Sequence, residues 1–187
     1  MNAIDKHGVS GFKDRETAAR QLLPLLNKFK TQDGIVLAIP RGGIPLGRII
    51  ADELGWPLEP LMIKKIGHPE NAEFAIGAVS ESDVFMDQIL KEVPVSYVEA
   101  EAKRIRELLV KRRAYFMNGR PPASVKGKTV MLVDDGIATG RTVLAGVRLL
   151  RSRQPAQIIV VTPVSATDAA TKIRIAARSE EHTSELQ

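Results

Sequence analysis

One segment of the chain combines two adjacent carboxylates with a loop of small residues. Residues 130–142 read VMLVDDGIATGRT, an apolar run that ends in Asp134 and Asp135 and continues into a loop of small residues. In an open parallel sheet, ligands bind at the carboxyl ends of the strands. The helix expected after the loop would present unpaired backbone N–H groups to a phosphate, and Gly136 and Gly140 would let the phosphate approach closely.

Two carboxylates beside a phosphate site need ligands of their own. An ionised carboxylate repels phosphate, but it accepts hydrogen bonds from sugar hydroxyls and binds divalent cations. A ligand with a phosphate at one end, a ribose in the middle and a magnesium-bound group beyond satisfies both halves of the segment. A P-loop is excluded, because only three residues separate Gly136 from Gly140 and because Arg141 stands where that motif requires Lys.

The same segment resembles the phosphoribosyl-pyrophosphate (PRPP) signature of the type I phosphoribosyltransferases, a hydrophobic strand followed by two acids, a small loop and Thr-Gly-x-Thr. The resemblance implies that Asp134 and Asp135 hold the ribose hydroxyls, with a catalytic role for Asp135, and that residues 138–142 wrap the 5′-phosphate. It also implies Mg²⁺ as cofactor, held indirectly through bound PRPP near the two acids. The residues expected to bind PRPP are Asp134, Asp135, Gly136, Ile137, Ala138, Thr139, Gly140, Arg141 and Thr142.

A second small loop, AIPRGG at residues 38–43, ends the first apolar run of the chain. Arg41 suits a bidentate contact with diphosphate oxygens. Taken alone, the loop reads more readily as a tight turn with a solvated Arg, but the downstream signature favours the family's pyrophosphate loop, in which members often hold a strained or cis peptide. The residues expected to bind pyrophosphate are Pro40, Arg41, Gly42, Gly43, Lys64 and Lys65.

The interval 64–77 opens with two adjacent lysines. Lys64 and Lys65 would concentrate positive charge near a leaving pyrophosphate, and Lys65 is assigned a catalytic role; ordinary solvated lysines are the alternative. Glycine, proline and asparagine in the interval suit a mobile loop that closes over the site, as the family resemblance implies. His68 is a candidate general base and Glu73 a candidate orienting residue, although a structural role fits each of them too.

The elements that must position these residues alternate between strand and helix. Runs that are apolar on both faces predict central strands of a parallel sheet, at residues 34–39, 57–63, 129–133 and 157–161. Helical periods follow the first and third runs, at residues 44–54 and 143–150. The predicted fold class is therefore α/β, with a doubly wound, Rossmann-like parallel sheet flanked by helices. The resemblance adds the type I phosphoribosyltransferase fold with a small hood, supplied by residues 1–30 and 82–119.

Two further helices are predicted outside this alternation. One has an apolar stripe from Ala18 to Phe29, with Asp14 as its N-cap and a kink, or a division into two short helices, at Pro24. The other covers residues 96–116, and its inward side chains are Val98, Ala102, Ile105, Leu109 and Phe116. Its basic outer face consists of Lys103, Arg104, Arg106, Lys111, Arg112 and Arg113. A solvated face is the favoured interpretation, with nucleic-acid binding and subunit contact as alternatives.

Composition excludes several classes of protein. The 187 residues are 44% hydrophobic and 26% charged, which indicates one folded domain rather than a disordered chain. The absence of Cys removes disulfides, Cys nucleophiles and Cys zinc sites, and the three His are too far apart for a local metal motif. A formal charge of +5 favours an anionic partner, while one Trp, two Tyr and five Phe leave few rings for stacking on nucleic acid. No apolar run reaches the roughly 18 residues of a membrane helix, so a cytoplasmic location is expected.

The last ten residues differ from the rest of the chain. Residues 178–187 read RSEEHTSELQ, polar and without period, and resemble the translation of a sequencing adapter; a natural polar tail is the alternative. The expected organisation is one phosphoribosyltransferase domain over residues 1–177 and a non-native tail over residues 178–187. On this interpretation the natural chain is cut short, and residues 157–161 form an exposed sheet edge.

The resemblance extends beyond the two loops to a bacterial branch of predicted phosphoribosyltransferases whose acceptor is undefined. The residues that carry this resemblance are the sequence segments 12–15, 39–43, 64–67, 75–79 and 133–139. The predicted function is transfer of the 5-phosphoribosyl group from PRPP to a nitrogenous, nucleobase-like acceptor with release of pyrophosphate. The alternative is a PRPP-sensing regulator that binds nucleic acid without turnover. The expected partners are PRPP and the small acceptor, without a membrane and with nucleic acid disfavoured, and a homodimer is compatible with the sequence.

Overall fold

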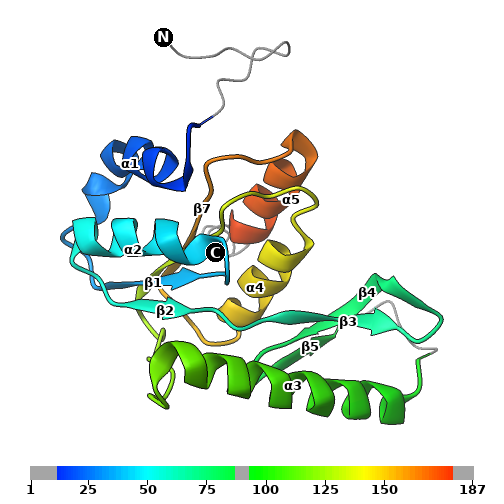
Figure 1. Ribbon diagram of the computed structural model, residues 1–187. Helices are drawn as coiled ribbons and strands as arrows, with labels where there is room; N and C mark the ends of the chain where they lie inside the picture. The colour runs from blue at the N-terminus through cyan, green and yellow to red at the C-terminus, as the bar shows by residue number, and fades with distance from the viewer. Residues whose placement is uncertain (1–11, 87–92, 179–187) are drawn as a thin grey trace, which may run out of the picture.

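The computed structural model describes residues 12–86 and 93–178. Its elements are, in chain order, α1 (Arg15–Leu26), the 3-10 turn η1 (Asn27–Phe29), β1 (Gly34–Ala38), α2 (Gly43–Leu54), β2 (Leu58–Pro60), β3 (Lys64–His68), β4 (Asn71–Val79), β5 (Val84–Met86), α3 (Val95–Met117), β6 (Thr129–Val133), α4 (Arg141–Arg151), β7 (Gln157–Val161) and α5 (Thr167–Arg178). Four parallel strands form one sheet in the order β2-β1-β6-β7, and a second sheet has the order β3-β4-β5 (Figure 1).

Both faces of the parallel sheet are covered by helices. In β1, Ile35 and Leu37 belong to an apolar cluster with α4 and α5, whereas Val36 and Ala38 belong to one with α1 and α2. This division follows from the alternation of side chains along a strand. All five residues of β1 and of β6 are buried, as expected for central parallel strands. The predicted doubly wound α/β fold is thereby confirmed.

The second sheet packs against α3, which lies along the lower side of the molecule in Figure 1. Ala102, Ile105 and Leu109 are buried there, as predicted. The prediction for Phe116 was wrong, because that ring is 38% exposed and Met117 is buried instead. The buried stripe continues from Leu109 through Arg113 to Met117, in steps of four residues.

The basic face of α3 differs from the prediction at Arg113. Arg113, predicted to be outward and solvated, is buried and forms an ion pair with the buried Glu59 of β2, with 2.6 Å between Nη2 and Oε2. Glu59 accepts further hydrogen bonds from the backbone N–H of Ala123. A buried carboxylate needs such a partner, and this requirement turns one arginine of the face inward. The remaining lysines on this face and Arg104 and Arg112 are exposed, and Arg106 is half-buried.

A second arginine joins the end of α4 to the second sheet. Arg153, just beyond α4, donates through Nε and Nη2 to Oδ2 of Asp83 at 2.9 and 2.6 Å. Its Nη2 also donates to the hydroxyl of Ser80 at 3.1 Å. The turn between β4 and β5 is therefore held to the end of α4 by charged hydrogen bonds.

Several boundaries differ from the predictions. The strand expected over residues 57–63 is only β2, because Leu61–Ile63 continue without a ladder although the N–H of Leu61 still donates to Ala38. Asp14 caps α1 as predicted. Pro24, where a kink or a division into two short helices was expected, lies inside α1, and the chain passes into the turn η1 only after Leu26. β7 forms an edge of the sheet. Within residues 12–86 and 93–178, no helix is long and apolar enough to cross a bilayer.

Candidate active site

Two adjacent carboxylates stand where β6 ends. The N–H of Asp134 donates to the carbonyl of Val161 at 3.1 Å and so keeps the two strands paired past their ends. The N–H of Asp135 donates to Oδ1 of Asp134 at 3.0 Å. Burial raises the pKa of Asp134 to about 6, and the neighbouring charge of Asp135 adds to this effect. One of the two acids therefore titrates close to neutral pH.

The loop after the acids is anchored at its centre. The Ile137 side chain is buried in the core, its N–H donates to the carbonyl of Val164 at 2.9 Å, and its carbonyl accepts from the N–H of Ala166 at 2.9 Å. On either side of this anchor, Gly136, Ala138 and Thr139 are exposed. The backbone of these exposed residues is available to a ligand, whereas both backbone polar groups of Ile137 already have partners.

Gly140 joins the loop to α4 in a conformation that suits glycine. Its φ is 71°, in the left-handed region, and a Cβ at this position would meet Cβ of Ala169 at 3.2 Å. The close approach of α5 and the left-handed turn thus both require the absence of a side chain. α4 begins immediately afterwards at Arg141, so its N-terminus faces the exposed part of the loop.

The predicted pyrophosphate loop touches the two acids. Its start is tied to β6, because the N–H of Ile39 donates to the carbonyl of Val133 at 2.8 Å. Gly42 lies directly against Asp135, since a Cβ on Gly42 would overlap the carboxylate, and Gly43 lies against the carbonyl of Val133, which a Cβ would meet at 2.6 Å. The peptide bond between Pro40 and Arg41 is cis. The two loops are thus one continuous surface at the carboxyl edge of the sheet.

The interval 64–77 is not the irregular loop that the sequence suggested. β3 and β4 pair in antiparallel fashion across most of it, with register shifts at Gly67. Adjacent strand residues face opposite ways, and the two lysines consequently separate. Lys65 lines a cavity of about 250 Å³ together with Arg141 and Thr142 of α4.

Lys64 lies toward α3 instead. Its charge lowers the pKa of Glu101, after the larger effect of the hydrogen bond from Arg104. The two lysines are therefore separated by the strand geometry, and of the two only Lys65 lines the cavity that Arg141 and Thr142 also line.

The two candidates near the end of the hairpin have local contacts. Nδ1 of His68 accepts from the N–H of Glu70 at 3.2 Å, and its ring meets Phe74 edge to face with 6.1 Å between centroids. The backbone of Glu73 lies in β4, and its side chain is outside the description. These contacts hold the His68 ring against the turn between β3 and β4.

Two features of the site were missed by sequence reasoning. Arg15 donates through Nε and Nη2 to Oδ2 of Asp135, from 120 positions away in the chain. Arg41 lines a cavity of about 450 Å³ with Tyr115 and Phe116 of α3. No short sequence pattern predicts either contact, because each joins two segments that are distant in the sequence and adjacent only in the folded chain.

Comparison with known proteins identifies the family. A family model described as "Phosphoribosyl transferase domain" matches residues 13–181. The chain belongs to the phosphoribosyltransferase family. The family match includes both loops at the carboxyl edge of the sheet.

Relatives of this phosphoribosyltransferase domain are found among curated proteins and solved structures. Rv0571c of Mycobacterium tuberculosis, named after the same family, is 32% identical over 161 residues, which are 84% of this chain and 36% of that protein. The chain thus spans little more than a third of the curated relatives that it matches. TT1426 of Thermus thermophilus is 36% identical with a TM-score of 0.80, over 89% of this chain and 81% of that one. A hypoxanthine phosphoribosyltransferase of Staphylococcus aureus, at 13% identity and a TM-score of 0.51 over 90% and 74% of the two chains, shares the fold.

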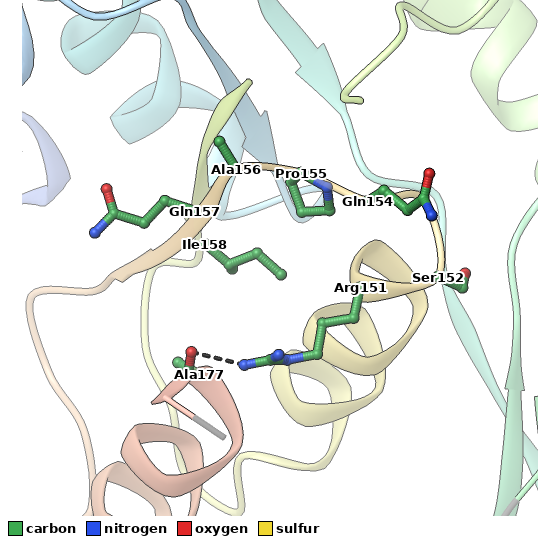
Figure 2. A pocket seen from close by; sticks show the side chains of 8 residues that line it. All are labelled: Arg151, Ser152, Gln154, Pro155, Ala156, Gln157, Ile158 and Ala177. Atoms are coloured by element: carbon green, nitrogen blue, oxygen red, sulfur yellow. Dashed lines mark hydrogen bonds between the residues drawn. The ribbon is translucent and has the colours of Figure 1, made fainter. Parts of the chain in front are cut away.

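A further cavity of the phosphoribosyltransferase domain lies away from this site. It measures about 580 Å³ and is lined by the turn between α4 and β7 and by the end of α5 (Figure 2). There the Arg151 guanidinium donates to the carbonyls of Ala176 and Ala177, each at 2.7 Å, and so satisfies the last turn of α5. Gln157, at the amino end of β7, lines the same cavity. The cavity therefore lies at the amino ends of the parallel strands, whereas Asp134 lies at their carboxyl ends.

Proposed function

We propose that this domain transfers the 5-phosphoribosyl group from PRPP to a nitrogen atom of a small, nucleobase-like acceptor and releases pyrophosphate. The observation that carries the proposal is the contact between the two loops, in which Gly42 lies against the carboxylate of Asp135. A ligand seated there meets acids, exposed loop backbone and a helix N-terminus at once. These are the groups that a ribose with phosphate at one end and diphosphate at the other requires.

Each part of PRPP has a proposed set of contacts. Asp134 and Asp135 accept hydrogen bonds from the ribose 2′- and 3′-hydroxyls, the backbone of residues 138–142 binds the 5′-phosphate, and residues 40–43 bind the pyrophosphate. Lys65 adds positive charge on the side of the hairpin. Departure of pyrophosphate leaves positive character at the ribose C1, so the residues act chiefly by positioning the ligand and by stabilising the negative leaving group.

The acids also fit a Mg²⁺ ion that arrives with PRPP. Asp134 and Asp135 offer carboxylate oxygens, which this hard cation prefers. Among residues 12–86 and 93–178, however, no group of three His, Cys, Asp or Glu is placed to hold a metal alone. We therefore propose a Mg²⁺ ion held through bound PRPP and lying near the two acids, where its charge would help to neutralise the leaving pyrophosphate.

Calorimetric titration with PRPP and Mg²⁺ tests the proposal. We expect saturable binding that is lost when Asp134 and Asp135 are both replaced by Asn, while Asp52→Asn, at an exposed ion pair with Arg48, binds as the wild type does. A screen of purine and pyrimidine bases for pyrophosphate release then identifies the acceptor. No heat of binding, or equal binding by the double variant, would contradict the assignment.

Replacing Lys65 tests whether the domain catalyses the transfer or only senses PRPP. Because its proposed partner is the leaving group, Lys65→Ala is expected to bind PRPP within about tenfold of the wild type while turnover falls by two orders of magnitude or more. Lys64→Ala, on the opposite face of β3, is the matched control and should retain turnover. Equal loss of binding and turnover in Lys65→Ala would remove the leaving-group role, and tight PRPP binding without release of pyrophosphate from any base would favour a regulator.

A further inference from the structure

The side chain of Arg15, the first residue of α1, contacts Asp135, one of the two acids that follow β6. Its Nε and Nη2 donate to the same oxygen, Oδ2 of Asp135, at 2.9 and 2.7 Å. The side chain of Arg15 is 61% exposed and that of Asp135 is 28% exposed. Exposed ion pairs contribute little to folding stability, so the contact is better explained by what it does to Asp135.

The start of α1 holds this arginine in place. Asp14 caps the helix, because its Oδ1 accepts from the N–H of Thr17 at 2.7 Å. The cap fixes the point at which the Arg15 side chain leaves the backbone, and it gives a physical reason for the FKDR sequence at residues 12–15. On the opposite side, Gly42 closes in on the same carboxylate. Asp135 is therefore held between α1 and the pyrophosphate loop.

We propose that Arg15 is a positioning residue of the ribose site, a role that rests on the proposed function. It holds Asp135 through Oδ2 and leaves Oδ1 for a ribose hydroxyl. Within the described parts of the chain, Oδ1 of Asp135 accepts no hydrogen bond. The guanidinium also offsets the repulsion between two neighbouring carboxylates, which accept the stronger hydrogen bonds from hydroxyls when they are ionised.

Calorimetry with PRPP and Mg²⁺ on Arg15→Gln and Arg15→Lys tests this role. We expect Arg15→Gln to weaken binding at least tenfold, with an unchanged urea midpoint, and Arg15→Lys to recover part of the loss. Arg20→Gln is the matched control, since Arg20 lies on the same helix in an exposed pair with Glu16, and it should bind as the wild type does.

A double-variant cycle separates positioning from direct contact with the ligand. If Arg15 acts through Asp135, then Arg15→Gln should cause no further loss of affinity in an Asp135→Asn background. Additive losses, or wild-type affinity in Arg15→Gln, would overturn the inference while leaving the proposed function intact. Failure of the wild type itself to bind PRPP would refute the proposed function, and the role of Arg15 would fall with it.

Discussion

Replacing Asp134 by Asn should stabilise the ligand-free protein near neutral pH. The carboxyl group is half-buried at the end of β6, and burial raises its pKa to about 6 from an ordinary value of 3.8. In the unfolded chain the group ionises at the ordinary value. Between these two values the folded state retains a proton that the unfolded state releases, so the stability of the wild type falls as pH rises from about 4 to about 6.

The size of the effect follows from the two pKa values. Their difference corresponds to about 3 kcal/mol of unfavourable free energy when the group is fully ionised. Solvent around the partly exposed carboxylate screens the charge, and we therefore expect Asp134→Asn to gain about 1–2 kcal/mol at pH 7.5. Asn retains an oxygen that can accept from the N–H of Asp135, so the local hydrogen bond is preserved.

Urea unfolding followed by the fluorescence of Trp56, the one Trp of the chain, measures this difference. The gain of Asp134→Asn over the wild type should be mostly absent at pH 4, grow toward pH 6 and level off above pH 7. Asp135→Asn, which loses the ion pair with Arg15, is the matched control and should show no gain at pH 7.5. A gain that is the same at pH 4 and pH 7.5, or a less stable variant at pH 7.5, would refute the reasoning.

Two substitutions elsewhere test the packing around the site. Gly140→Ala should lower the free energy of unfolding by about 1–2 kcal/mol, because its φ of 71° disfavours a Cβ; Gly136→Ala, which has open space around it, should change the urea midpoint little. Arg113→Met should cost about 3–5 kcal/mol, because it leaves the Glu59 carboxylate buried without its cation. Adding Glu59→Gln should recover part of that loss in thermal unfolding, and a double variant as unstable as the single one would contradict the account.

The sequence predicted the parts of the fold that repeat locally. Apolar runs such as Thr129–Val133 indicate central strands, and Asp14 before an apolar stripe indicates a helix start. The acid-loop-helix segment could be located for the same reason, because its residues are consecutive. Lys64 and Lys65 were grouped as one charge cluster, and the alternation that places them on opposite faces becomes visible only once the interval is known to contain β3.

Contacts between distant segments could not be predicted. Arg113 belongs by spacing to a basic helix face, and only the presence of Glu59 on β2 explains its burial. Arg15 likewise carries no local signal, because its partner lies 120 positions away. In both cases a charged side chain is placed by a carboxylate from another element, and single-sequence patterns report only on residues close in the chain.

The arginines that join the two sheets have a consequence for partial unfolding. Suppose that the β3-β4-β5 sheet and α3 unfolded while the parallel sheet stayed folded. The ion pair between Arg113 and Glu59 would then be broken, and so would the two hydrogen bonds from Arg153 to Asp83. Loss of Arg113 would leave the Glu59 carboxylate at the core without its cation, which is costly, so such an intermediate is disfavoured. Amide hydrogens of Ile66 and Ile76, deep in the second sheet, should therefore exchange only with global opening, at rates close to those of β1 and β6. The turn between β3 and β4, beyond the irregular pairing at Gly67, carries neither of these ion pairs. Its amide hydrogens should therefore exchange through local opening.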